Sequence, residues 1–331
     1  MALDCDLFAP LVNESRLHRQ FRDLRDAPFH SGSRALMNSL YSRMGDPNGN
    51  FLRDFQGSGF HSRLFELACF AYLESANLKI DRSYPQPDFL ASRDSVTVAV
   101  ESVTANPSHD QGQDIAIDRM PDLSQEEIYE KVAGEFPRRM SAILHKKLSK
   151  RYHHAAHVSG KPLVFMIAPN FEAGSVFYTD DALLYCLYGP PESEPIWQGR
   201  PAFFWDNQAG SISAVLYCNA FTVSRFFRLA FATAKSPIVA IRSGVCYRPH
   251  SSSDFGGCKF EFQVGDPAAP RETWDEGVTL FHNPFAAHPL PQGFLPASST
   301  ISIRDGYIYR EVLGFHPLVS SMHAHVPNPD V

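Results

Sequence analysis

The sequence predicts an α/β protein, a sandwich of helices around a mixed β-sheet, from three observations. Of the 331 residues, 44% are hydrophobic and 26 are Phe, enough apolar material for a large core or two modest ones. Segments with helical periodicity alternate with Val-rich segments of period two, in the order helix, strand, strand, helix, strand, helix. No internal repeat or low-complexity tract interrupts this order.

The first half of the chain begins with a charged N-terminal helical segment, residues 1–55, which includes a turn cluster, GDPNGN. A long apolar helix is expected over residues 61–77, after a Gly-Ser-Gly break. DRSYPQPDF ends it, because proline disfavours a helical conformation in the residue before it. TVAVESV, 97–103, alternates as a strand does. If RDS, 93–95, turns the chain, this strand pairs antiparallel with the extended segment before it.

Helix signals follow this hairpin. Ser124 is a helix N-cap with Glu127 three residues later, the spacing of a capping box. A second helix is predicted over 138–152, and PLVFMIAP after it is a buried strand. The segment 56–185 therefore forms the predicted core of the protein.

Residues 186–331 are predicted to form a C-terminal α+β extension that packs on this core. SISAVLYCN and SPIVAIRSGVCYR are expected as strands, with FTVSRFFRLAFATA between them as a helix. After residue 248 the content of Pro, Gly, Ser and His rises, which predicts long loops.

Composition excludes several classes of protein. The net charge is −6, so any contact with nucleic acid has to come from a local basic patch. None of the six cysteines has C-x-x-C spacing, which excludes the common zinc-finger and redox motifs. The chain starts without the pattern of a signal peptide and has no apolar run near 18 residues. We expect a soluble cytoplasmic protein with reduced thiols and no membrane contact.

Two carboxylates stand out in PDFLASRDSVTVAVES. Asp88 follows a proline where one extended segment ends, and Glu101 lies on the next strand, on one face with Thr97, Ala99 and Val103. An antiparallel hairpin would bring the two carboxylates together at one end. Mg²⁺ is usually held by one or two carboxylates with waters and phosphate oxygens. The pair is thus a candidate metal site; the alternative is two solvent-facing carboxylates that only flank a hairpin.

The stretch around these carboxylates resembles the PD-(D/E)XK nuclease superfamily. FELACFAYLES with Glu66, PDF with Asp88 and VAVES with Glu101 follow the order of that pattern. Residues 50–170, and more weakly LFHNPFAAHPLP, also look like a group of bacterial proteins that carry this core. The resemblance implies a restriction-endonuclease-like α/β/α sandwich with a mixed central sheet, plus N-terminal helices and a C-terminal extension.

The same resemblance implies a function. It implies a nuclease that uses Mg²⁺ or Mn²⁺ held by Asp88 and Glu101, with Glu66 assisting. Nucleic acid, DNA rather than RNA, is the implied substrate, in bacterial defence or nucleic-acid processing, with a homodimer as one option. Glu66 has an alternative role, which is to cap an edge of the core through Arg63.

One position departs from the superfamily pattern, since Val103 stands where a lysine usually follows the strand carboxylate. The superfamily also includes members whose lysine has moved to the following helix, which here offers Lys146, Lys147 and Lys150. The apolar stripe of this helix is Met140, Leu144, Leu148 and Tyr152. At about 100° per residue, Lys147 lies about 60° from the centre of the stripe and Lys146 nearly opposite. Lys147 is therefore the predicted catalytic lysine.

The same helix predicts a nucleic-acid-binding surface. Residues 138–161 contain seven Lys or Arg and no Asp or Glu, and phosphate backbones bind such patches. The alternative is a solvated helix face. The residues predicted to contact nucleic acid are Arg138, Arg139, Lys146, Lys150 and Arg151.

Two rival functions remain open from the sequence. A nuclease-like scaffold without its lysine could bind nucleic acid or a protein partner and cleave nothing, and Val103 is the best support for that. His153 and His157 in HHAAH have the i, i+4 spacing of a helical zinc pair, although a third ligand is missing. No G-x-S-x-G elbow, P-loop or dinucleotide fingerprint is present.

Overall fold

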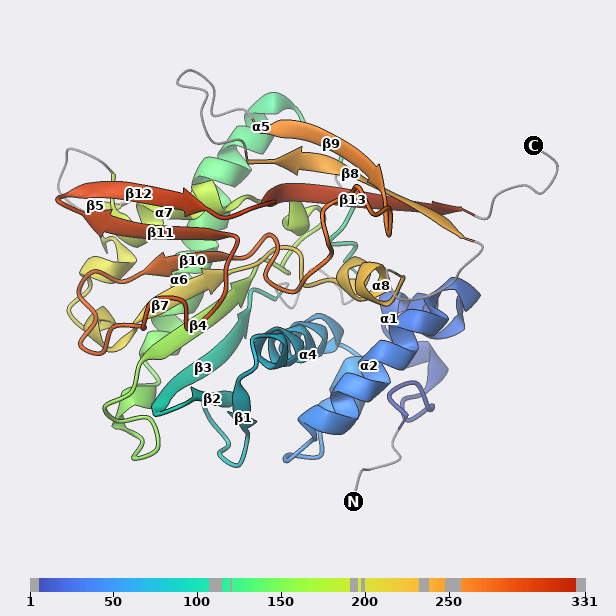
Figure 1. The fold of residues 1–331 in the computed structure, drawn as a ribbon, viewed down its shortest axis with the longest axis horizontal. Coiled ribbons are helices and arrows are strands. Elements are labelled where there is room, and N and C mark those ends of the chain that lie inside the picture. Colours follow the sequence, from blue (N-terminus) through green and yellow to red (C-terminus); the bar gives the residue numbers. More distant parts are fainter. Residues whose placement is uncertain are drawn as a thin grey trace.

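An eight-stranded mixed sheet organises the protein (Figure 1). A computed structural model describes residues 6–106, 115–119, 121–190, 196–197, 200–231, 238–247 and 257–325 of the chain. In spatial order the strands of the sheet are β1 (Lys79–Asp81), β2 (Phe89–Arg93), β3 (Val96–Thr104), β4 (Leu163–Ala168), β7 (Ala214–Tyr217), β10 (Thr279–His282), β11 (Ser299–Arg304) and β12 (Tyr307–Val312).

Both strand directions occur in this sheet. β1, β2 and β3 pair antiparallel, and β3, β4 and β7 pair parallel. β10 is antiparallel to β7 and parallel to β11, which pairs antiparallel with the edge strand β12. The hairpin expected around residues 93–95 forms, with Asp94 in the left-handed conformation at its turn (φ 54°). The prediction of an α/β fold with a mixed sheet is confirmed.

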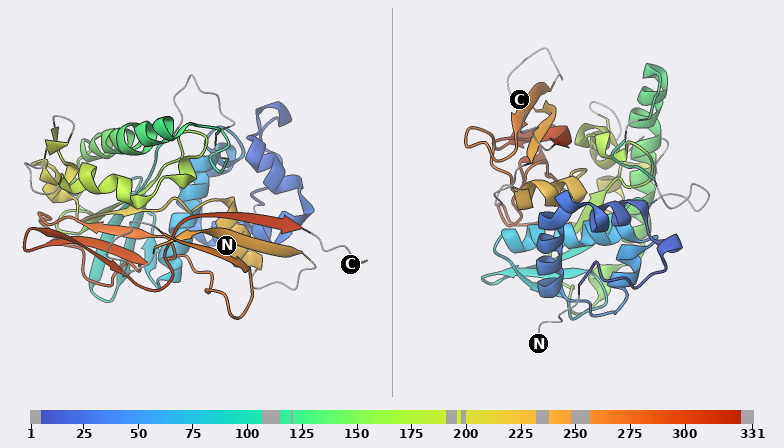
Figure 2. Two further views of the ribbon diagram at one scale, coloured as in Figure 1. Left: turned by 90° about the horizontal axis from the view of Figure 1, so that it is seen from above. Right: turned by 90° about the vertical axis from the view of Figure 1, so that its right-hand side faces the viewer.

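The side chains of β3 point alternately into two apolar clusters, one on each face of the sheet. Val98 and Val100 belong to the apolar cluster that contains helix α4 (Phe60–Ser75), and Ala99 and Val103 to the cluster of α6 (Phe136–Leu148). Figure 2 shows α6 lying over one face of the sheet. β3 thus presents one side to each helix, which decides where its polar side chains point.

Helix α6 packs on the sheet through the apolar stripe that was predicted from its sequence. Met140, Leu144 and Leu148 of the predicted stripe are all buried, while lysines occupy its other faces. The predicted helix extended to residue 152, but α6 ends at Leu148. Arg151 takes the left-handed conformation (φ 51°), which breaks the helix, and a 3₁₀ turn follows at Tyr152–His154.

The N-terminal segment is helical, as predicted. Its α-helices are α1 (Arg19–Asp26), α2 (Ser31–Met44) and α3 (Phe51–Gln56). Their buried side chains, such as Phe21 and Met37, share one apolar cluster with α4 and the sheet. These helices therefore complete the layer on the α4 side.

The C-terminal part extends the large sheet and adds a smaller one. β10, β11 and β12 lie in the large sheet, and a three-stranded sheet has the order β13 (Pro317–His325), β8 (Val239–Cys246), β9 (Cys258–Gln263). The long loops expected after residue 248 are present at 264–278 and 283–298, and strands β9 to β13 lie around them. Thr279, Leu280 and Phe281 of β10 are all buried, because β7 and β11 pair with this strand on its two sides.

The remaining elements are short. The capping box predicted at Ser124 and Glu127 is present at the start of α5, and a π-helical stretch, Lys131–Glu135, joins α5 to α6. These elements are α5 (Gln125–Glu130), α7 (Leu184–Tyr188), α8 (Val223–Phe231), β5 (Ile196–Trp197) and β6 (Arg200–Pro201). Within the described ranges, no helix is both long enough and apolar enough to cross a membrane.

Candidate active site

A cleft of about 740 Å³ brings most of the predicted site residues together. Its walls come from α4, from the end of the β2–β3 hairpin and from α6. The predicted residues that line it are Glu66, Asp88, Glu101, Arg139, Lys146, Lys147 and Lys150. Arg63, Ser62 and Thr104 complete its polar wall. Positions separated by more than 80 residues in the sequence therefore face one space.

The β2–β3 register places Asp88 and Glu101 at one end of the hairpin. Phe89 pairs with Val100, so the next step outward sets Asp88 opposite Glu101. Oδ2 of Asp88 accepts hydrogen bonds from the backbone N–H of Ser102 at 2.8 Å and from its hydroxyl at 2.5 Å. These two bonds fix the orientation of the Asp88 carboxylate.

Glu101 is the most enclosed anion of the hairpin, with 4% of its surface exposed. Its Oε1 accepts hydrogen bonds from Nζ of Lys147 at 2.5 Å and from the Tyr152 hydroxyl at 2.6 Å. Burial raises the pKa of Glu101 above its ordinary value, and the charge of Asp88 adds to that rise. Lys147 and Tyr152 act against it by stabilising the ionised form. The two carboxylates therefore interact electrostatically in one poorly solvated place.

Glu66 enters the cleft from α4 with both of its oxygens engaged. Oε2 accepts from Arg63 at 2.7 Å, and Oε1 forms an ion pair with Arg82. Arg63 also binds Asp54 at 2.6 Å. Burial first, and then the charge of Asp88, raises the pKa of Glu66. The pairing with Arg63 is the alternative role that the sequence allowed for Glu66, and its role as a metal ligand stays a prediction.

The hairpin carboxylates suit a magnesium site in which water and substrate oxygens complete the coordination. Oδ1 of Asp88 and Oε2 of Glu101 have no hydrogen-bond partner among the described residues. Mg²⁺ takes one or two carboxylates and completes its shell with waters and substrate phosphates. In the described ranges no three His, Cys, Asp or Glu side chains are grouped so as to hold a metal ion. The donor set thus fits a two-carboxylate site and does not fit a site closed by three protein ligands.

Positive charge exceeds negative charge in the cleft wall. Among the described residues that line the cleft, five cationic side chains, from Arg63, Arg139, Lys146, Lys147 and Lys150, face three carboxylates. The excess suits a polyanion whose phosphates lie along the wall. The cleft as a whole is therefore attractive to negative ligands although the chain carries a net charge of −6.

Two cations of the predicted patch lie elsewhere. Arg138 lies in the first turn of α6, is exposed, and donates its Nε–H to the carbonyl of Gly134 at 3.0 Å. Arg151, predicted to share the face of Lys147, follows the end of α6 and is exposed. Neither lines the cleft. The shared face is wrong because the helix stops before Arg151.

The predicted zinc pair does not form. His153 and His157 would need one continuous helix, but α6 ends at Leu148. Nε2 of His157 is 2.8 Å from the carbonyl oxygen of Gln86, and its ring stacks on Tyr84 at 3.8 Å. His157 therefore serves to pack the loop before Asp88.

Three partners of the site were not identified from the sequence as functional. Ser102 and Arg82 orient Asp88 and Glu66, and neither carries a local signal that reveals this. Tyr152 was assigned to the apolar stripe because of its spacing. A tyrosine that ends such a stripe has a hydroxyl that needs a polar partner, which was a signal for some buried acceptor but did not identify Glu101.

Comparison with family models, with curated proteins and with solved structures finds no match to this chain. The resemblance to the PD-(D/E)XK superfamily therefore stays a prediction, and the function is inferred from the geometry of the cleft.

Proposed function

We propose that the protein is a metal-dependent phosphodiester hydrolase acting on nucleic acid, with its active site in the cleft at Asp88 and Glu101. In this proposal the two carboxylates hold Mg²⁺ or Mn²⁺. When bound, the ion would supply an activated water and stabilise negative charge on the scissile phosphate. The observation that carries the proposal is the meeting of Asp88, Glu101 and Lys147 in a cleft with excess positive charge.

Lys147 has the position required of a catalytic lysine in this scheme. Its stem runs from the apolar side of α6, and its ammonium stands 2.5 Å from Glu101. Val103 is 1% exposed and packs in the α6 cluster, on the same side of β3 as Glu101. An ammonium supplied from α6 therefore reaches the space that a lysine at position 103 would serve. There it would orient the attacking water and neutralise charge on the phosphate.

The remaining cations would bind the substrate backbone. Lys146, Lys150 and Arg139 line the cleft on the α6 side and present positive charge to it. Glu66 would keep Arg63 at the mouth of the cleft through their 2.7 Å pair. DNA as the substrate, and a role in bacterial defence, belong to this proposal on the strength of the resemblance.

We also propose that the core of the protein has a restriction-endonuclease-like fold. The order α4, β1, β2, β3, α6, β4, with α4 and α6 on opposite sides of the strands, supports a restriction-endonuclease-like core. The strand that carries Glu101 lies in the middle of this unit. The acidic pair then occupies the position that the resemblance implies.

A binding module without activity is the second candidate. Its support is the direct ion pair between Lys147 and Glu101, which occupies both the lysine and one carboxylate oxygen. In such a module this pair would stabilise the cleft, and the basic wall would still hold phosphates. The two candidates differ in whether any phosphodiester bond is broken.

Single-turnover cleavage of a labelled oligonucleotide in Mg²⁺ tests the proposal. Asp88→Asn keeps the shape of the side chain and removes its charge, and we expect a loss of about 10²-fold or more in rate. Asp94→Asn is the matched control, because it removes the same charge at the far turn of the hairpin and Asn tolerates its positive φ. Cleavage by the wild-type protein and by Asp94→Asn, with the expected loss in Asp88→Asn, supports the proposal. Binding without cleavage by the wild-type protein, in Mg²⁺ and in Mn²⁺, would establish the binding module instead.

A further inference from the structure

A second polar pocket, of about 200 Å³, lies between the start of α8 and strand β13. It shares no lining residue with the cleft. We call it the α8 pocket; its polar lining includes Thr222, Ser224 and Arg228 from the α8 side and Ser320, Ser321 and His323 from β13. Since about 10–15 Å³ holds one water, the pocket has room for a larger polar group.

The pocket borders a buried cluster with an excess of positive charge. Arg225 and Arg242 are fully buried and Arg228 is 3% exposed. Their ion pairs involve two buried carboxylates, Glu272 and Glu276. Within the described residues this cluster therefore holds three guanidinium groups and two carboxylates. The three arginines share these two carboxylates, so the cluster keeps one excess positive charge, which would attract an additional anion.

Arg228 is the member of the cluster that reaches the pocket. Its Nε donates to Glu272 at 3.0 Å, whereas its buried terminal NH2 group has no hydrogen-bond partner among the described residues. Burial, and then the charges of Arg242 and Arg225, lower the pKa of Arg228 to about 10. The guanidinium thus remains charged at neutral pH, and Arg228 lines the pocket with hydrogen-bond donors that the described residues do not use.

The start of α8 adds donors to the same space. The helix has nine residues, and the Arg225 amide donates to the carbonyl of Thr222 at 3.0 Å, which leaves the amides of Val223 and Ser224 at the helix start. Such a helix start attracts phosphate through these N–H groups and the helix dipole. The hydroxyls of Thr222 and Ser224 stand beside it. Asp118 is the acidic residue of the lining; it is exposed and accepts a hydrogen bond from Gln20 at 3.4 Å.

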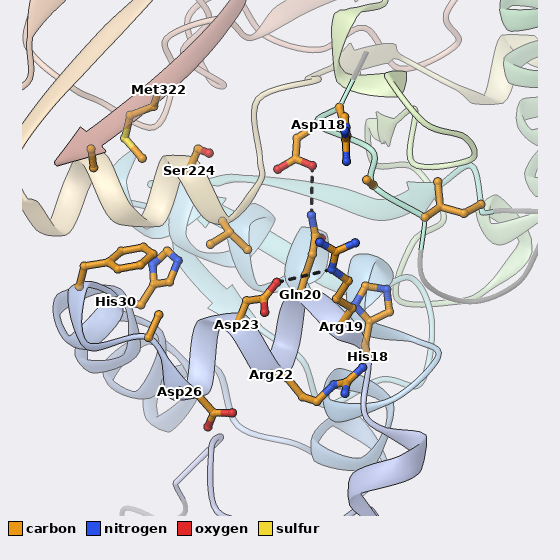
Figure 3. Close-up of a pocket in the computed structure, with 17 residues that line it drawn as sticks. His18, Arg19, Gln20, Arg22, Asp23, Asp26, His30, Asp118, Ser224 and Met322 are labelled. Atoms are coloured by element: carbon orange, nitrogen blue, oxygen red, sulfur yellow. Dashed lines mark hydrogen bonds and ion pairs between the residues drawn. The ribbon is translucent and has the colours of Figure 1, made fainter. Parts of the chain in front are cut away.

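We propose that the α8 pocket binds a phosphate group, with Arg228 as its charged donor. A larger cavity, of about 790 Å³, adjoins the pocket and shares Asp118, Ser224 and Met322 with it (Figure 3). Figure 3 shows Ser224 and Met322 on one side of this cavity and Asp118 with Gln20 on another. The larger cavity gives room for the body of a phosphomonoester, so the ligand is either free phosphate or a small phosphorylated molecule.

Calorimetric titration at constant ionic strength, with inorganic phosphate and with ribose 5-phosphate, tests this site. We expect saturable binding to the wild-type protein, and affinity about tenfold weaker or worse in Arg228→Gln, which loses a charged hydrogen bond. Thr222→Val is the second variant, because it keeps the side-chain shape and should also weaken binding if Arg228→Gln fails to fold. Tighter binding of ribose 5-phosphate would assign the larger cavity to its sugar, and equal affinity would assign free phosphate.

The double variant Lys146→Met, Lys150→Met distinguishes the pocket from the cleft. Phosphate binding that survives in this variant and weakens in Thr222→Val supports the pocket. Binding that is lost in the lysine variant, or unchanged in both pocket variants, would overturn the proposal. Neither result depends on whether the cleft hydrolyses nucleic acid.

Discussion

At Lys147 a flexible side chain joins the apolar side of α6 to the carboxylate of Glu101. The distance from Nζ to Oε1 is 2.5 Å, and Tyr152 donates to the same oxygen from the turn beyond the helix. Two donors from outside its own sheet therefore favour the ionised form of Glu101, against the effect of burial on its pKa. This arrangement makes the lysine, and not the basic helix in general, the residue to examine for catalysis.

Replacing Lys147 by Met should reduce cleavage by about 10²-fold, because an ammonium aimed at the reacting phosphate is lost. Lys146→Met is the matched control, since the two lysines are neighbours on α6 and have equal helix propensity. Lys146 is exposed, so its loss should change the rate far less. The measurement is the single-turnover rate at saturating protein. Equal rates for the two variants would show that Lys147 has no special role.

At the scale of the element, α6 combines two functions on different faces. Its apolar residues pack on the sheet, while Lys146, Lys150 and Arg139 face the cleft. The spacing of the stripe correctly predicted the packed face and the approach of Lys147 to Glu101. It could not predict where the helix stops, because the left-handed conformation of Arg151 depends on how the following turn packs.

The basic wall should determine the salt dependence of nucleic-acid binding. Replacing Lys146 and Lys150 by Glu should weaken binding at every sequence and lower the slope of log K against log salt by roughly 1 to 2. Arg138→Glu changes charge on the same helix but outside the cleft, so its slope should stay near that of the wild type. Fluorescence anisotropy between low and moderate salt measures both. A control variant that lowers the slope as much would assign binding to the whole helix surface.

At the scale of the whole molecule, one apolar cluster unites residues from all three predicted segments. Phe21, Val98 and Leu280 belong to it, and α2 packs against α8. Hydrophobic periodicity predicted the helices and the Val-rich strands one by one. It did not predict that β10 to β12 would continue the central sheet, because strand pairing over such sequence separations is decided by tertiary contacts.

Part of the candidate site was predictable from the sequence and part was not. The hairpin made the meeting of Asp88 and Glu101 predictable, since an antiparallel register follows from a tight turn. Arg82, the second arginine partner of Glu66, and the hydroxyl of Tyr152 come from contacts that no local pattern encodes. The sequence also did not predict the α8 pocket, because Arg228 is buried by strands that lie far from it in the sequence.

Acid sensitivity should report on the contact between the N-terminal helices and α8. The His30 ring lies 5.8 Å from that of Phe227, with Ser33 and Arg34 beside it. Burial, and then the charge of Arg34, lower the pKa of His30 to about 4. The unfolded chain therefore binds a proton more readily, so stability is full above about pH 6.5 and falls as the pH drops from 6.5 to about 4.

The variant His30→Gln should lose stability less steeply across that interval, as measured by urea unfolding at several pH values. His154→Gln is the control, since His154 is exposed. Parallel pH profiles for the wild type and His30→Gln would contradict the assigned burial of His30.

The central claim is that Asp88 and Glu101 share one divalent ion, and anomalous diffraction from a crystal soaked in Mn²⁺ tests it most directly. The expected result is one Mn²⁺ between the Asp88 and Glu101 carboxylates, with the ammonium of Lys147 beside it. Its anomalous peak should be absent in Asp88→Asn and present in Asp94→Asn. Ordered hairpin carboxylates without an anomalous peak, or a manganese ion bound elsewhere in the cleft, would contradict the proposed metal site.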